Sequence, residues 1–336
     1  MNELQITLLI VGGTAIFGMI AYNWWQDHRM RRQITDRFGI SDVDPLFDNT
    51  RFEPGLEGIL AAFSDEPFDN SKEEEYDKAL FADFYVNFDQ AQTHTPLRAF
   101  VESVRQSTNK RVLVSVCSEA VNYDTRTTWY QAQRYSGEFY TLRVSPQLAN
   151  RKGPLTAIEF SNLLNKVRKF AEEHSGHLSF SEMRDVVSKS ETLDQAAAIL
   201  DTLLGLHCLL PDHLADSIVV DLLTESGWKN NGRYWQLSDE QGQLASMIIH
   251  KAPGKKLLSF TIDVPNSFNP LKALGEVVTL CHQLNQQFGA PLIDDNGKTL
   301  TTEAIEEIYT HLVERVNHLT DSGFTPGSKT ACLLFS

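Results

Sequence analysis

The sequence lacks the short motifs by which many enzymes, metal sites and nucleotide-binding proteins are recognised. It contains no glycine-rich phosphate loop, no GxSxG nucleophile turn, no HExxH helix and no CxxC pair. The four cysteines are isolated and sit in apolar runs, where a free thiol packs as a small hydrophobe in a reducing compartment. These absences predict a protein that is not an enzyme and that has no cofactor, metal or small-molecule substrate.

Positive charge is also scarce, because 44 acidic residues outnumber 30 basic ones and the formal net charge is -14. Binding to nucleic acid phosphates needs a basic surface, so the acidic composition argues against a nucleic acid partner, and none is expected. The acidic sequence Asp294–Gly297 could suggest a metal loop, but it lacks the later glutamate that a calcium loop requires. We predict a tight turn there, since Asn-Gly favours positive φ.

Charged side chains are absent from Leu4 to Tyr22, the first apolar run of the chain. A helix rising ~1.5 Å per residue needs about 20 residues to cross a hydrocarbon layer ~30 Å thick. Tryptophans close the run, and indole rings favour the headgroup layer. We therefore predict a transmembrane anchor at residues 1–25, with membrane contacts from Leu4, Leu8, Leu9, Ile10, Val11, Ile16, Phe17, Ile20, Trp24 and Trp25.

Arginines follow the apolar run at once, at Arg29, Arg31 and Arg32, whereas only Glu3 and the amino terminus carry charge before it. By the positive-inside rule, the N-terminus lies outside and the remaining chain is cytoplasmic. The alternative is a cleaved secretory signal peptide. That alternative needs a basic region before the apolar core and a small-residue cleavage site, and this sequence offers neither.

Residues 26–80 are predicted to be a basic juxtamembrane stretch followed by a flexible acidic linker. Acidic residues dominate from about residue 38 onward, and prolines interrupt any long helix. Such a composition extends the chain and repels it from an anionic leaflet. The apolar segment 55–63 is either a transient helix without a partner or a docking segment.

From residue 81 onward the hydrophobic pattern is that of a folded protein, and it occurs twice. Each copy predicts the order β-α-β-β-β-α-β, an antiparallel sheet with two helices on one face. In the first copy, 128–135 and 138–146 are expected to form a hairpin around Ser136-Gly137. A helix at 181–200 joins the copies, and an amphipathic helix follows the second copy, with Ile305, Ile308, Leu312, Val316 and Leu319 on one face.

The predicted fold class is therefore α+β: a single N-terminal transmembrane helix, two tandem split βαβ-like units and a C-terminal amphipathic helix. The predicted divisions are the anchor at 1–25, the linker at 26–80, a first sheet unit at 81–180, a connecting helix at 181–204, a second sheet unit at 205–325 and a tail at 326–336.

The second unit resembles the C-terminal domain of the ZipA family of membrane-anchored division proteins. The segments QLASMIIHKAPG (243–254) and LSFTIDVP (258–265) resemble the hairpin of that family and its strand ending in VP. LIDDNGKTLT (292–301) resembles the strand, acidic turn and helix entry that follow in the family. The N-terminal anchor fits the same layout. The short acidic linker and the enlarged globular part depart from it.

The resemblance implies a function as an adaptor that binds the C-terminal peptide of FtsZ and tethers the Z ring to the membrane. In the family, helices cover one sheet face and the other face is a shallow apolar groove for that peptide. The implied location is the bacterial inner membrane at midcell, with a periplasmic N-terminus and a cytoplasmic C-terminal domain. The expected partners are the FtsZ tail and inner-membrane lipid.

The partner-binding residues expected from this resemblance lie on the open face of the second sheet. In the strand 259–264, Phe260, Ile262 and Val264 are expected to face the helices and Ser259, Thr261 and Asp263 the open side. Leu206 and Cys208 join the groove if His207 points to the helices. The predicted contacts are Leu206, Cys208, Tyr234, Met247, Ser259 and Thr261. Alternatively the first copy supplies the groove, through Phe139, Thr141 and Trp129 or Tyr130.

Two other functions remain open at this point. One is a membrane-tethered scaffold that binds a different septal or envelope protein. The other is an enzyme of unknown kind, which would need a deep polar pocket with converging titratable groups.

Overall fold

The computed structural model describes residues 70–336, apart from 73–76, 94–96, 120–127 and 253–254. The predicted anchor at 1–25, its flanking arginines and most of the linker at 26–80 lie outside the described residues. Among the residues that are described, no helix is both long and apolar enough to cross a membrane. The described chain is an α+β protein with antiparallel sheets, which confirms that part of the predicted fold class.

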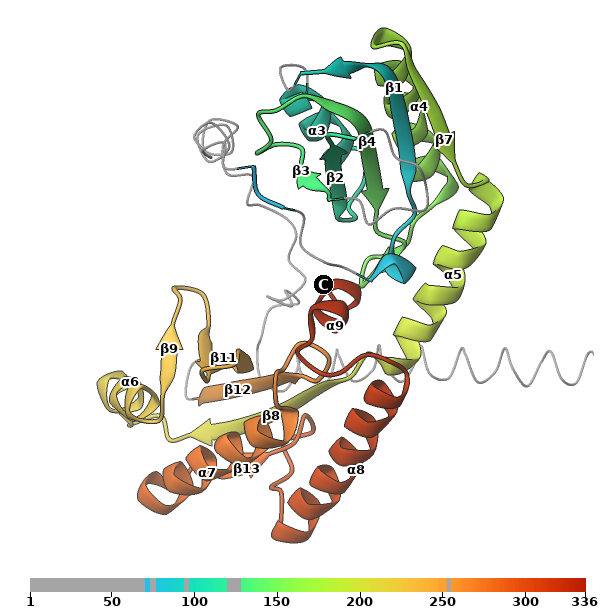
Figure 1. The fold of residues 1–336 in the computed structure, drawn as a ribbon. Helices are drawn as coiled ribbons and strands as arrows, with labels where there is room; N and C mark the ends of the chain where they lie inside the picture. The colour runs from blue at the N-terminus through green and yellow to red at the C-terminus, as the bar shows by residue number, and fades with distance from the viewer. Residues whose placement is uncertain (1–69, 73–76, 94–96, 120–127, 253–254) are drawn as a thin grey trace, which may run out of the picture. The chain divides into compact units, whose positions relative to one another are not determined.

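The described chain forms two compact units, each with its own antiparallel sheet (Figure 1). The first unit comprises residues 70–202, 264–268 and 314–336, and the second comprises 203–263 and 269–313. The chain therefore leaves the first unit, builds the second and returns. The last residues of the sequence belong to the first unit.

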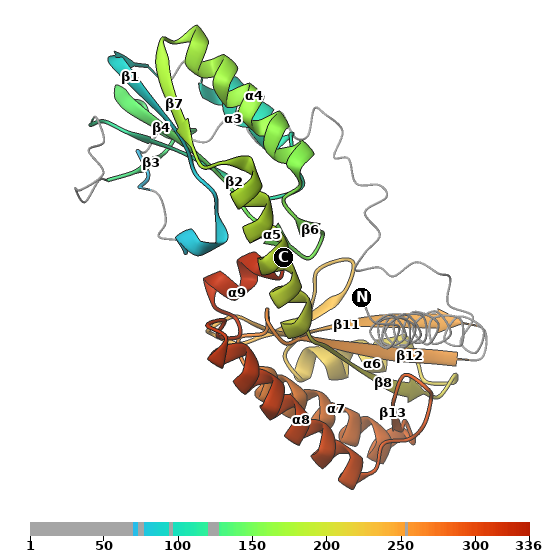
Figure 2. The same ribbon diagram turned by 90° about the vertical axis from the view of Figure 1, so that its right-hand side faces the viewer.

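The first unit contains a five-stranded sheet in the order β3-β2-β4-β1-β7. Helices α3 and α4 pack on one of its faces, where they cover Phe84, Val86 and Phe88 of strand β1 (Figures 1 and 2). The elements are η1 (Lys78–Leu80), β1 (Phe84–Gln92), α3 (Leu97–Arg105), β2 (Val112–Cys117), β3 (Tyr130–Gln131), β4 (Phe139–Pro146), β5 (Ala149–Asn150), β6 (Gly153–Pro154), α4 (Ala157–Glu173), β7 (Gly176–Phe180), α5 (Met183–Leu200) and α9 (Lys329–Leu334).

Local sequence explains the limits of α4 and the start of β7. Thr156 and Glu159 form a capping box at the helix N-terminus, because each side chain accepts a hydrogen bond from the backbone N–H of the other. The helix ends at Glu173, and Ser175 takes a positive φ of 52°. Strand β7 begins at Gly176. A glycine is needed there because a Cβ would lie 2.6 Å from Val86 Cγ1, which is too close.

The second unit contains a six-stranded sheet in the order β13-β8-β12-β11-β10-β9. Helices α7 and α8 lie on one side of it, and α6 packs on β9 (Figures 1 and 2). The elements are β8 (Leu203–Leu210), α6 (Asp216–Glu225), β9 (Trp228–Asn230), β10 (Trp235–Ser238), β11 (Gln243–Ala252), β12 (Lys255–Asp263), α7 (Pro270–Phe288), β13 (Leu292–Ile293) and α8 (Thr302–Asp321), whose last part, from Glu314, belongs to the first unit.

The two sheets share three strands in the same spatial order. In the first unit β1 lies between β4 and β7, and in the second β8 lies between β12 and β13. In both units a helix, α4 or α7, precedes the last of these strands. The strands on the other side of this trio differ, since the second unit continues as the meander β12-β11-β10-β9.

The hairpin predicted around Ser136-Gly137 is wrong. Strand β3 pairs with β2, whereas β4 pairs with β2 on one side and β1 on the other. The physical reason is burial: Leu142 and Val144 of β4 are fully buried, so this strand is most stable between two other apolar strands.

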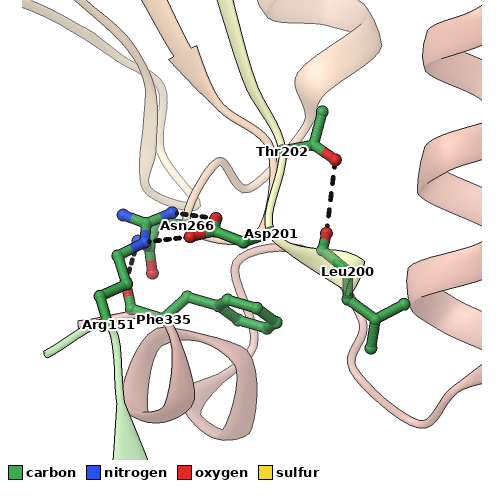
Figure 3. A network of polar contacts seen from close by, with 6 residues as sticks. All are labelled: Arg151, Leu200, Asp201, Thr202, Asn266 and Phe335. Atoms are coloured by element: carbon green, nitrogen blue, oxygen red, sulfur yellow. Dashed lines mark hydrogen bonds and ion pairs between the residues drawn. The ribbon is translucent and has the colours of Figure 1, made fainter. Parts of the chain in front are cut away.

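Residues 326–336 were expected to be a tail, but they contain helix α9 and are partly buried. Ala331, Leu334 and Phe335 are at most 1% exposed. Figure 3 shows the polar contacts nearby: the Arg151 guanidinium donates two hydrogen bonds to the Asp201 carboxylate, at 2.9 and 2.6 Å. The Asn266 amide donates to the backbone oxygen of Phe335 at 2.9 Å. The C-terminus is thus part of the first unit's structure.

Candidate functional site

The two faces of the second sheet have different chemistry. Phe260 and Ile262 of β12 are buried, as the alternation of the strand predicted, and Val264 just after it is buried as well. Ser259 and Thr261 lie on the opposite face and are half-buried. We call this second face, which points away from α7, the open face.

The positions predicted for Leu206, Cys208 and Met247 are wrong. All three are at most 3% exposed, and their strand partners place them on the helix-covered face. Leu206 and Met247 pair with Phe260, and Cys208 pairs with Leu258. A residue directly opposite another in an antiparallel pair shares its face, so these side chains belong to the core.

The same register places His207 on the open face, because it pairs with Ser259. The prediction for Leu206 and Cys208 depended on the opposite orientation of His207. The β8 sequence LLGLHCLL is apolar at both alternating sets of positions, so the strand itself does not specify its face.

Tyr234, Ser259 and Thr261 are accessible from the open face. Tyr234 is half-buried and directly precedes Trp235, which faces the core, so alternation directs its ring to the open side. The binding roles of these three residues stay predictions. The prediction omitted several other open-face residues, namely His207, Leu209, Gln236, Ile248, His250 and Leu257.

His207 is the centre of a polar cluster on the open face. Its Nδ1 lies 2.9 Å from Ser259 Oγ, and its Nε2 lies 2.8 Å from Asp295 Oδ1. Nearby His250 has a pKa below its ordinary value, because burial and the charge of His207 both disfavour its protonated form. The cluster therefore concentrates hydrogen-bonding capacity within a half-buried surface.

Asp295 reaches His207 because of the turn that follows β13. The Asp294 carboxylate accepts hydrogen bonds from the backbone N–H of Asn296 and Lys298, and Gly297 has a φ of 77°. The predicted tight turn is confirmed, and Asp294 is occupied in stabilising it. In the part of the chain that the structure describes, no group of three or more metal-ligating side chains occurs.

A serine, a histidine and a carboxylate also form the triad of many hydrolases, so the surroundings of Ser259 decide what this cluster can do. Strand β12 is hydrogen-bonded on both sides, to β8 and to β11. The backbone N–H groups around Ser259 are therefore used in the sheet, and they are the usual donors of an oxyanion hole. The cluster is better suited to binding polar groups than to acyl transfer.

A segment that forms part of the open face matches a known protein family. Residues 250–311 match the family model described as the C-terminal FtsZ-binding domain of ZipA. The resemblance to the ZipA family is confirmed. Among curated proteins, none matches the chain. The ZipA match runs from the end of β11 through β12, α7 and β13 into α8. It lies in the second unit except for residues 264–268, and it contains Ser259, Thr261 and Asp295.

The sheet of the first unit, whose strands lie outside the ZipA match, has a face that is already covered. The Arg143 guanidinium carbon lies 4.1 Å from the centre of the Trp129 ring, and Arg143 is 2% exposed. Thr141 is fully buried and donates to Asn87 Oδ1 at 3.0 Å. Burial and the Asp83 carboxylate raise the pKa of Tyr85, on the neighbouring strand, to about 12.

The alternative groove in the first unit is therefore not supported by the positions of its residues. Phe139 lies in the helix-side core, and the pairing of β4 with β1 shifts in register between Thr141 and Phe139. Trp129 covers Arg143, and Tyr130 packs against Tyr135 with a ring separation of 4.9 Å. These side chains fill the surface that a partner would need.

Proposed function

We propose that this chain is a membrane-anchored cell-division adaptor that binds the C-terminal peptide of FtsZ and tethers the Z ring to the inner membrane. The observation that carries the proposal is the match of residues 250–311 to an FtsZ-binding domain, because the matched segment includes β12 and the end of β11, which form part of the open face. The protein acts by binding and is not an enzyme in this proposal.

The proposed binding surface is the open face of the second sheet. Half-buried Leu209 and Ile248 supply apolar area, and they flank the pair formed by His207 and Ser259. An amphipathic peptide helix would place its apolar side on the leucine and the isoleucine, and its polar side chains near the histidine and the serine. Tyr234 and Thr261 extend the surface on either side.

Such a surface should bind weakly to a single peptide. A peptide of about 15 residues that must order itself on a shallow face is expected to bind with roughly micromolar affinity. Many peptides along one filament, and many adaptors confined to one membrane, raise the total binding without new contacts. The adaptor therefore needs both its sheet and its anchor.

The proposed anchor at residues 1–25 gives the protein its orientation. The arginines that follow it favour a periplasmic N-terminus and a cytoplasmic folded part. FtsZ filaments assemble in the cytoplasm, so this orientation places the open face in the same compartment as the filaments. We place the protein at midcell in the inner membrane on the same grounds.

The decisive binding experiment compares full-length FtsZ with FtsZ lacking its C-terminal peptide, each titrated with the full chain in detergent. We expect binding only with the peptide present, and loss of most of it in Ile248→Glu, which places a charge at the centre of the open face. Ile158→Glu is the matched control, because Ile158 lies on α4 of the first unit and is 75% exposed.

Equal binding of FtsZ without its peptide, or equal loss in both variants, would contradict the proposed groove. A separate comparison removes residues 1–25. We expect this deletion to leave binding in solution intact and to abolish support of the ring in cells. A deletion variant that still localises to midcell and divides normally would contradict the role of the anchor.

A further inference from the structure

The carboxylate of Asp295 lies over the open face of the second sheet, beside strand β8. Its Oδ1 is 2.8 Å from Nε2 of His207, and a Cβ at Gly205 would lie 3.3 Å from the same oxygen. Gly205 and His207 pair with Thr261 and Ser259, so all four positions belong to the open face. The turn after β13 thus brings a negative charge onto the surface proposed for the FtsZ peptide.

The hydrogen bonds of His207 determine which groups this cluster offers to a ligand. A carboxylate only accepts hydrogen bonds, so Nε2 of His207 carries a proton and donates it to Asp295. In the neutral ring Nδ1 is then an acceptor, and the Ser259 hydroxyl donates to it across 2.9 Å. The serine oxygen and the carboxylate keep lone pairs but have no further proton to donate. The cluster therefore presents acceptors and one negative charge.

Asp295 differs from Asp239 of the same unit in the partner of its carboxylate. The Lys272 ammonium donates to Asp239 at 2.8 Å, so a positive charge offsets that carboxylate. Among the described residues, His207 alone bonds to the Asp295 carboxylate, and a neutral imidazole does not cancel its charge. The Asp295 side chain is 54% exposed and that of His207 is 20% exposed. The carboxylate is thus held in place by the histidine and remains accessible.

The surroundings of the carboxylate suit a long cationic side chain. Leu203, at the start of β8, is 45% exposed, and alternation places it on the open face beside Gly205. Half-buried Leu209 lies on the same face beyond His207. Lysine and arginine combine an apolar stem with a head that only donates hydrogen bonds. The stem would lie along a leucine while the head reaches the carboxylate.

We propose that Asp295 binds the ammonium or guanidinium group of one lysine or arginine of the FtsZ peptide, and that His207 positions the carboxylate for this contact. The inference rests on the proposed function, because it requires the peptide to occupy the open face. A peptide helix uses its own backbone N–H groups beyond its first turn, so the donor must come from a side chain. Partial burial by the peptide makes such a charged hydrogen bond stronger than a fully exposed one.

The same cluster would act against acidic side chains at this place. An aspartate or glutamate beside Asp295 would meet a like charge, and neither Asp295 nor Ser259 has a proton to donate to it. The contact therefore contributes to the choice of partner, whereas the apolar residues of the open face contribute most of the affinity.

The test measures the binding of fluorescent FtsZ C-terminal peptides to the full chain in detergent. Each lysine or arginine of the peptide is replaced by glutamine in turn, and we expect one replacement to weaken binding about fivefold. Asp295→Asn keeps an acceptor for His207 but removes the charge, so it should weaken binding of the unchanged peptide by the same factor. It should not weaken binding of that glutamine peptide further, because both changes remove one contact.

Control variants separate the charge from its position. Glu276→Gln removes an equal charge from an exposed site on α7, which covers the other face of the sheet, and should leave every affinity unchanged. His207→Leu should reduce the preference for the cationic peptide while the glutamine peptide still binds. His207→Gln, whose amide can donate to Asp295, should restore most of the preference.

The outcomes distinguish this inference from the proposed function. If the parent chain binds no FtsZ peptide, the proposed function is contradicted and this inference is lost with it. If the peptide binds but no lysine or arginine replacement matters, only this inference is overturned. The same holds if Asp295→Asn binds like the parent chain, if it weakens both peptides equally, or if Glu276→Gln has the same effect. An unchanged preference in His207→Leu would overturn the positioning role.

Discussion

Strands β4 and β12 hold similar positions in the two sheets and carry similar sequences, TLRVSP and TIDVP, yet their outward side chains differ in exposure. Thr141 and Ser145 of β4 are fully buried and Arg143 is 2% exposed. In β12, Thr261 is half-buried, as is the neighbouring Ser259. The first sheet covers its outer face with its own side chains, whereas the second leaves that face accessible to a partner.

The difference shows how one arrangement of strands can serve two purposes. In the first unit, a buried charge is paired with an aromatic ring and a buried hydroxyl with an amide, and these contacts stabilise the unit itself. In the second, a histidine bridges a serine and an aspartate at a surface. Similar strands therefore give a structural face in one unit and a candidate binding face in the other.

The largest expected effect separates the stabilities of the two units. Phe335→Ala should lower the free energy of unfolding of the first unit by ~3–5 kcal/mol, because it leaves a cavity at a side chain that is 1% exposed. Hydrogen exchange followed unit by unit would measure this. Ile199→Ala, at a side chain 65% exposed on α5, is the control and should change little. Equal loss of protection in the second unit would contradict the assignment of the C-terminus.

A matched pair of substitutions compares the two strands directly. Thr141→Val should destabilise the first unit by ~1–3 kcal/mol, because it removes a fully buried hydroxyl and leaves the side-chain oxygen of half-buried Asn87 without this donor. Thr261→Val should change the stability of the second unit by only about 0.5 kcal/mol, since Thr261 is half-buried. Urea denaturation of both variants would test this. Similar changes in the free energy of unfolding for the two variants would contradict the proposed difference between the outer faces of β4 and β12.

Alkaline titration should distinguish Tyr85 from the other tyrosines. Its pKa of about 12 means that the phenol stays protonated in the folded first unit while an unfolded chain ionises near pH 10. Its contribution to stability is thus complete below about pH 10 and is lost as the pH rises to about 12. Absorbance at the phenolate band, compared with Tyr85→Phe, would show one late-titrating group. Its absence would contradict the proposed surroundings of Tyr85.

The smallest expected effect is on the unfolding of the second unit at low pH. Hydrogen bonds from Lys251 and Lys256 lower the pKa of Asp216 from 3.8 to about 2. The carboxylate therefore supports folding above about pH 4, and this support is lost as the pH falls toward 2. Because the pair is exposed, only a slight shift of the acid transition is expected in Asp216→Asn, measured by circular dichroism. A large shift would show that the contact matters more than its exposure implies.

Much of the architecture follows from patterns within single segments. The alternation of Phe260 and Ile262 predicted which face of β12 is buried, and Gly289 ends α7 with a φ of 67°, a conformation that glycine favours. The connecting helix expected at 181–200 is α5. These features depend on periodicity and on backbone conformation, which a local sequence carries.

The candidate site was only partly predictable. Ser259 and Thr261 follow from alternation, but His207 does not, because β8 is apolar on both sides and takes its face from its pairing with β12.

The sequence by itself determined the α+β class, the polar and apolar faces of β12, and the resemblance to the ZipA domain. The tertiary structure decided the pairing of β4, the burial of Leu206, Cys208 and Met247, and the return of the C-terminus to the first unit. The physical reason is the separation along the chain of the residues that each effect involves. Periodicity and turns act between neighbours in the chain, whereas register and burial depend on which distant segment supplies the opposing surface.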